Sequence, residues 1–171
     1  IVTIIDDPLL EGGLCSQPFD DEGVACYRNT IVDKGKLKTL LYNLKTAKKD
    51  GVKSTGNASK ASYASTIGIS PSNFFIKPGE KAREELIANL GDGIFITEVQ
   101  GLHAGANAVS GDFSLSAKGF EIKSGEIIKP IDQITVAGNF YKMLLDIVEL
   151  GSDLKVGIPS GGCYGCPSVL V

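Results

Sequence analysis

The stretch that decides the fold reads Gly93-Ile-Phe-Ile-Thr-Glu-Val-Gln-Gly-Leu-His-Ala-Gly-Ala-Asn-Ala-Val-Ser-Gly-Asp-Phe-Ser-Leu-Ser-Ala-Lys-Gly-Phe-Glu-Ile122. It predicts a strand over Ile94–Val99, followed by a loop that contains three glycines. Apolar and polar residues then alternate from Phe113 to Lys118, which is the period of a half-buried strand. The chain is therefore expected to contain a strand, a glycine-rich loop and a returning strand.

Further turns and strands extend this pattern into a meander. Lys123–Glu126 has the composition of a turn, Ile127–Ile128 opens the next strand, and Ile134–Val136 is expected to form a third. An apolar stripe after Asn139 predicts a helix that Asn139 caps. A second helix is predicted over Glu80–Leu90, with Gly91 after its end.

Residues 37–49 permit two interpretations. Leu37–Tyr42 fits a strand, followed by a short helix that Asn43 caps and Gly51 ends. A single helix over Leu37–Lys49 is the alternative, because its leucines also fit a helical period. Other expected strands are Ile1–Ile5, Val24–Val32, Ser72–Lys77 and a short one at the C-terminus, with an irregular loop over Ser54–Ile69. The order predicts an α+β fold, with a largely antiparallel sheet and about three interspersed helices.

Composition limits the classes of function. The 171 residues predict a single domain over 1–171, and a net charge of −3 without a Lys/Arg cluster gives no reason to expect nucleic-acid binding. No apolar run is long enough to cross a membrane. The chain begins with Ile1 inside an apolar strand, so we expect a fragment of a longer protein. Four cysteines without a signal peptide favour reduced thiols and a cytoplasmic protein.

The glycine-rich loop carries the candidate binding residues. Polar side chains in a loop held by rigid strands are suited to binding a substrate or a partner protein. These residues are His103, Asn107, Ser110 and Asp112, with Asn139 at the following helix. The alternative is structural: His103 would then only donate or accept a hydrogen bond, and Asp112 would form a turn.

Cys163 and Cys166 form the sharpest local pattern. A redox pair of the thioredoxin kind needs a helix after the first cysteine, and a strand is expected here instead. A zinc site needs further ligands, and only Cys15, Cys26 and His103 could supply them. Buried or incidental thiols are the alternative. We predict no catalytic residue, because the chain has no nucleophile elbow, no phosphate loop and no pair of histidines.

Five blocks of sequence nevertheless resemble a known family when taken in order. They are Pro18–Val24 (PFDDEGV), Lys53–Ser59 (KSTGNAS), Asn73–Gly79 (NFFIKPG), Val109–Ser114 (VSGDFS) and Ile134–Asn139 (ITVAGN). Together they are similar to the C-terminal half of the TldD/PmbA family, on the PmbA branch, which is also called TldE. The resemblance spans nearly the whole chain.

The resemblance implies a mostly β C-terminal domain that pairs subunits. It also implies a cytosolic heteromeric zinc protease that trims peptides and unfolded or modified proteins. Family members are labelled modulators of DNA gyrase. The TldD partner binds zinc through a His-Glu-x-x-x-His helix and a cysteine near its C-terminus. The PmbA branch generally lacks the histidine motif, so no cofactor is expected in this fragment, although zinc is expected in the complex.

Three functions are therefore compatible with the sequence. The chain could belong to a non-catalytic partner that shapes the substrate channel beside a TldD-like catalytic subunit. It could instead belong to a metallopeptidase that pairs with itself and carries its catalytic residues elsewhere in the longer protein. A non-proteolytic module that binds a protein partner is the third.

Overall fold

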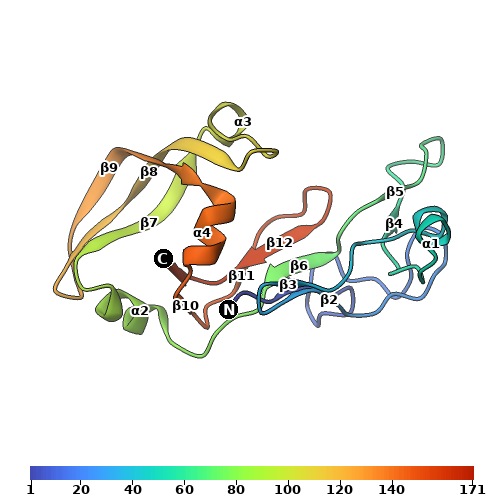
Figure 1. The fold of residues 1–171 in the computed structure, drawn as a ribbon, viewed down its shortest axis with the longest axis horizontal. Coiled ribbons are helices and arrows are strands. Elements are labelled where there is room, and N and C mark those ends of the chain that lie inside the picture. Colours follow the sequence, from blue (N-terminus) through green and yellow to red (C-terminus); the bar gives the residue numbers. More distant parts are fainter. The chain divides into compact units, whose positions relative to one another are not determined.

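The computed structural model describes residues 1–171, and their contacts divide the chain into two compact units (Figure 1). Unit 1 comprises Ile1–Pro78 and Leu154–Pro167, and unit 2 comprises Gly79–Asp153 and Ser168–Val171. The single domain expected over 1–171 stays a prediction. None of the helices combines the length and the apolar character that a membrane span requires.

Unit 1 is built on a six-stranded sheet in the order β11-β12-β6-β1-β2-β3. All neighbouring strands are antiparallel except β12 and β6, which are parallel. Buried apolar residues, among them Val2, Ile5 and Phe75, form its core. The strands are β1 (Ile4–Asp6), β2 (Asn29–Asp33), β3 (Lys36–Leu37), β6 (Asn73–Ile76), β11 (Lys155–Val156) and β12 (Cys163–Cys166).

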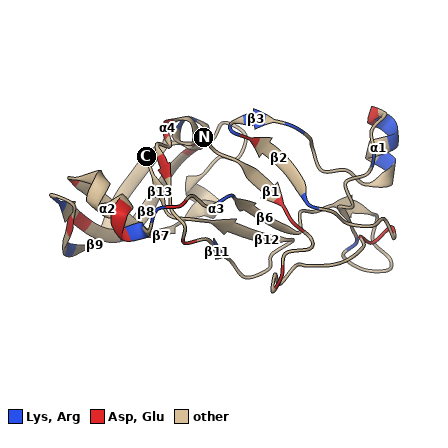
Figure 2. Ribbon diagram, turned by 90° about the horizontal axis from the view of Figure 1, so that it is seen from below, with Lys and Arg blue, Asp and Glu red and all other residues tan.

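The remainder of unit 1 contains α1 (Leu44–Asp50) and the short pair β4 (Ala58–Ser59) and β5 (Gly68–Ile69). The Asn43 side chain accepts a hydrogen bond from the Thr46 amide, and Gly51 ends the helix with φ 69°. This confirms the predicted short helix. The strand expected over Leu37–Tyr42 is wrong beyond Leu37, where only β3 forms. Figure 2 shows the lysines of α1 in blue, and Lys48 and Lys49 lie in its last turn as expected.

Unit 2 contains the three-stranded antiparallel sheet β7-β8-β9, formed by β7 (Gly93–Gln100), β8 (Asp112–Lys123) and β9 (Glu126–Asn139). Ser124 and Gly125 join β8 to β9 with positive φ values of 51° and 78°, the conformation of a type I′ hairpin. The prediction of two strands after this turn is wrong, because β9 is continuous. Pro130 does not interrupt β9, since β9 is an edge strand and needs no donor on its outer side.

The helices of unit 2 are α2 (Arg83–Leu90), α3 (Leu102–Gly105) and α4 (Phe140–Asp146), and β10 (Glu149–Leu150) pairs with β13 (Val169–Leu170). In Figure 1, α2 lies near the β8–β9 turn and α3 lies at the opposite end of the sheet. The helix predicted after Asn139 is shorter than its apolar stripe suggested. Ile147 is extended and buried, since the chain there turns to pair β10 with β13.

Candidate functional site

The loop that follows β7 is closed by its own backbone. Gly101 turns the chain with φ 89°, and α3 follows directly. The Asn107 amide then donates to the Asp112 carbonyl at 2.9 Å, and the Gly111 amide donates to the Asn107 carbonyl at 2.8 Å. A Cβ on Gly105 would lie 2.3 Å from the Ser114 carbonyl oxygen, so only glycine permits α3 to rest against β8. The loop is therefore a fixed structure.

Four of the five candidate residues come together in this loop. Asn107 Oδ1 accepts from the amides of Val109 and Ser110 at 2.9 and 3.1 Å. Asn139 Nδ2 donates to the Asp112 carboxylate and to the Ser110 carbonyl, each at 2.9 Å. The hydrogen bond from Asn139, and then that from Ser110, lowers the pKa of Asp112 below its ordinary value. Asp112 is therefore suited to bind a donor while ionised.

The first turn of α4 fixes the other side of the same loop. Asn139 Oδ1 accepts from the Lys142 amide at 3.1 Å and so caps the helix. The Tyr141 hydroxyl donates to the Ala108 carbonyl at 2.8 Å, and a Cβ on Gly111 would lie 2.5 Å from the Tyr141 ring. Asn139 thus holds both the loop and the helix. Its position after a strand and before an apolar stripe was the feature that made it predictable.

A shallow, open hollow of about 660 Å³ lies beside this cluster, lined by residues 104–108 and 112–114. Most of the lining side chains are small, so backbone atoms are close to the surface. Asn107 and Asp112 are the polar side chains most able to contact a ligand there. His103 is exposed on α3 and does not line the hollow. The arrangement is suited to hold a backbone segment, and it presents no nucleophile paired with a base.

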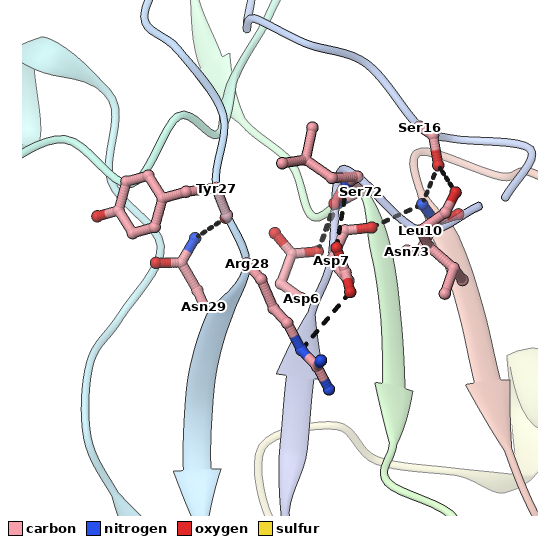
Figure 3. A network of polar contacts seen from close by, with 10 residues as sticks. Asp6, Asp7, Leu10, Ser16, Tyr27, Arg28, Asn29, Ser72 and Asn73 are labelled. Atoms are coloured by element: carbon pink, nitrogen blue, oxygen red, sulfur yellow. Dashed lines mark hydrogen bonds and ion pairs between the residues drawn. The ribbon is translucent and has the colours of Figure 1, made fainter.

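A second polar cluster, which the sequence analysis missed, is buried in unit 1 (Figure 3). The Asp6 carboxylate is 0% exposed and accepts from the Ser72 amide at 2.7 Å, the Ser72 hydroxyl at 2.9 Å and Asn57 Nδ2 at 2.6 Å. Burial raises the pKa of Asp6 above its ordinary value, against the lowering effect of these hydrogen bonds. Asn57 Oδ1 is buried without a hydrogen-bond partner.

Asn73 connects the same cluster to the loop over residues 8–18. Its Nδ2 donates to the Asp7 carbonyl at 2.8 Å and to Ser16 Oγ at 2.9 Å, while its Oδ1 accepts from the Cys15 amide at 3.2 Å. Asn73 is 0% exposed, and its bond to the Asp7 carbonyl is buried, while those with Ser16 and Cys15 are partly buried. The only hint in the sequence was an asparagine inside an apolar strand. We interpret this cluster as a structural link between the loop and the sheet.

The two cysteines of the C-terminal pattern lie in the extended strand β12. Cys163 is buried and Cys166 is exposed, since side chains three positions apart in a strand point to opposite faces. At about 3.3 Å per residue, their Cα atoms are roughly 10 Å apart. This geometry does not allow the Cys163 and Cys166 sulfurs to bind the same ligand.

The described residues contain no group of three or more histidine, cysteine, aspartate or glutamate side chains that could hold a metal ion. A zinc ion in a structural or catalytic protein site takes at least three such ligands. The residues of this chain therefore do not fit a zinc site by themselves.

Comparisons with known proteins reveal close relatives. A family model described as the PmbA/TldA metallopeptidase C-terminal domain matches residues 1–171. Metalloprotease PmbA of Escherichia coli O157:H7 is 38% identical over 154 residues, which are 90% of this chain and 32% of that protein. These findings agree with the resemblance carried by the five sequence blocks.

Solved structures share the fold over the same extent. A protein from Thermotoga maritima, described as a candidate modulator of a DNA gyrase, has a TM-score of 0.86 at 46% identity, over 99% of this chain and 37% of its own. TldE of Thermococcus kodakarensis also has a TM-score of 0.86, at 27% identity, over 99% of this chain and 38% of its own. The chain thus spans about a third of the length of the relatives it matches.

Proposed function

This chain belongs to the PmbA/TldA metallopeptidase family as a C-terminal domain, and from that premise we propose that it is part of a non-catalytic, TldE-like subunit. In this proposal the subunit shapes a peptide channel in the cytoplasm beside a TldD-like catalytic subunit. The similarity to TldE over 99% of the chain supports this role.

The free edge of β7 is the observation that carries the peptide-binding part of the proposal. In the order β7-β8-β9, β7 pairs with β8 on one side only, so its outward amides and carbonyls can accept an added strand. Three apolar side chains along this strand are exposed: Ile94 is 47%, Ile96 38% and Val99 40% exposed. An extended peptide with apolar side chains fits this edge.

The opposite edge, β9, is less suited to strand addition. Pro130 removes one backbone donor, and Gln133 has a positive φ of 57°. The pairing of β9 with β8 also shifts register twice, between Ala117 and Gly119 and between Glu121 and Ile122, whereas the pairing of β7 with β8 shifts once, between Ile96 and Glu98. Bulges and proline are the features by which proteins protect an edge from pairing. The added peptide is therefore assigned to β7.

Metal content of the full-length protein tests the non-catalytic role. Zinc is measured per chain for the wild type and for Cys163→Ser and Cys166→Ser. The proposal expects no zinc in any of the three proteins. About one zinc per wild-type chain would overturn it and favour a metallopeptidase that pairs with itself, and loss of that zinc in a variant would identify the cysteine as a ligand.

Peptide cleavage by the subunit mixed with a TldD-like partner tests the channel. Ile96→Glu places a charge on the β7 edge and is expected to lower kcat/KM by about tenfold or more. Ile128→Glu, at an exposed isoleucine of β9, is the matched control and should cleave like the wild type. Equal activity of both variants would refute the assignment to β7. Full cleavage by the partner alone would favour a non-proteolytic interaction module.

A further inference from the structure

The thiol of Cys15 contacts the thiol of Cys163, although 147 residues lie between them in the sequence. The Cys15 amide donates to Asn73 Oδ1 at 3.2 Å, and Asn73 is the cross-strand partner of Cys163 in the parallel β6–β12 pair. Paired residues of adjacent strands point to the same face. The side chains of Asn73 and Cys163 therefore share the face that the loop over residues 8–18 covers.

The next cross-strand pair of β6 and β12 identifies the opposite face of the sheet. Phe74 and Tyr164 are cross-strand partners, and their rings meet edge to face with centroids 6.3 Å apart. They occupy the opposite face, and Tyr164 is 51% exposed. Cys163, by contrast, is 0% exposed beneath the loop. Cys166 points to the same face as Tyr164, away from Cys163 and Cys15.

Access to the two thiols differs. Cys15 lies in a loop whose neighbours Leu9 and Leu14 are exposed, and it is itself partly exposed. Burial, followed by the contact with the Cys163 thiol, raises the pKa of Cys15 to about 11. A reagent from solvent therefore reaches Cys15 first, while Cys163 is positioned to react only with a group already on Cys15.

We propose that Cys15 and Cys163 are a disulfide-forming pair that ties the loop over residues 8–18 to β12 when the protein meets a peroxide or a low-molecular-weight disulfide. With hydrogen peroxide, the Cys15 thiolate attacks one oxygen, the O–O bond breaks, and water leaves after protonation. The Cys163 sulfur then attacks the sulfur of the Cys15 sulfenic acid and releases a second water. Both thiols are oxidised and the peroxide is reduced.

A disulfide reagent gives the same product by exchange. The Cys15 thiolate attacks one sulfur of the reagent, and one reagent thiol leaves with the proton. Cys163 displaces the second reagent thiol from the mixed disulfide. Two protein thiols are oxidised and one reagent disulfide is reduced to two thiols. Because the thiolate is the nucleophile, the high pKa of Cys15 makes the first step slow at neutral pH. As pH increases toward that pKa, the rate of this step should rise about tenfold per pH unit.

The experiment treats the full-length protein with oxidised glutathione at increasing pH and identifies disulfides by peptide mapping without reductant. The expected product is a Cys15–Cys163 crosslink whose rate rises with pH. Cys166→Ser should form it unchanged, and Cys15→Ser should not form it. A second measurement compares thermal midpoints, which should rise on oxidation in the wild type and not in Cys15→Ser.

Three outcomes would overturn the proposal. They are a crosslink between Cys163 and Cys166, a stable glutathione adduct on Cys15 that Cys163 never displaces, and Cys15 and Cys163 both recovered as thiols at every pH. Cys15→Ser is expected to fold, because the Cys15 side chain is partly exposed and its backbone amide, not its side chain, bonds to Asn73.

Discussion

Asp6→Asn is the substitution that most directly tests the physical account of unit 1. Asp6 is fully buried and its carboxylate accepts three hydrogen bonds, two from Ser72 and one from Asn57. The asparagine keeps an oxygen for Ser72 and carries no charge. Its nitrogen would face Asn57 Nδ2, so the Asn57 amide must turn over. The Asn57 oxygen, which has no partner in the wild type, then accepts from the new amide, while the hydrogen bond from Asn57 Nδ2 to the Ser70 carbonyl is lost.

The expected magnitude follows from proton linkage. Because burial raises the pKa of Asp6, the folded chain holds a proton that the unfolded chain has released. The stability that this contributes is fully present below the unfolded pKa of about 3.9 and is lost as pH rises through the folded pKa. Between these two pKa values, the wild type should lose about 1.4 kcal/mol per pH unit relative to Asp6→Asn.

Urea unfolding of both proteins, followed by far-ultraviolet circular dichroism from about pH 4 to about pH 8, measures this difference. Comparing the two proteins cancels the titration of the groups they share. Asp6→Ala is the companion variant. It leaves the Ser72 amide without its acceptor and removes one of the two acceptors of Asn57 Nδ2, the other being the Ser70 carbonyl. It should lower the free energy of unfolding by about 3 kcal/mol. The reasoning would be refuted if the stability of the wild type, relative to that of Asp6→Asn, stayed constant with pH or rose with pH.

Three further substitutions test other contacts. Asn73→Ala removes three hydrogen bonds of a buried side chain and should lower the free energy of unfolding, measured in urea, by about 3 kcal/mol. A loss below about 1 kcal/mol would contradict the link to the loop. Asn139→Ala removes the cap of α4 and should destabilise that helix by about 1 kcal/mol. It should also raise the pKa of Asp112 toward its ordinary value, which a carboxyl NMR titration detects. An unchanged Asp112 titration would contradict the cluster. Gly119→Ala would place a Cβ 2.0 Å from the Phe95 carbonyl oxygen. It should lower the thermal midpoint by several degrees, which corresponds to about 3 kcal/mol. An unchanged midpoint would contradict the close approach of β7 and β8.

Local chemistry made much of unit 2 predictable. Alternation from Phe113 to Lys118 indicated a half-buried strand, and β8 covers it. The Ser124-Gly125 turn was visible because two residues with positive φ favour glycine and small polar side chains. What the pattern did not reveal was the length of β9. A proline at 130 is compatible with a strand only if that strand is at an edge, and edge position is a property of the sheet.

The candidate loop shows the same division. Its glycines and polar residues marked it as a turn-rich segment between strands, and four of the five residues do gather there. His103 was chosen for its chemistry alone, and the structure leaves it exposed on α3 outside the cluster. The role of these residues in binding stays a prediction.

The sequence by itself determined the α+β class, the capped helix after Asn43 and the family, because each depends on residues close together or on blocks in order. Only the tertiary structure decided which distant groups meet. Asp6 with Ser72, and Cys15 with Cys163, are brought together by the strand order around β6, where β1 and β12 are its two neighbours. No local period encodes that order. It arises from burying the apolar faces of all six strands at once, and this places their polar residues as well.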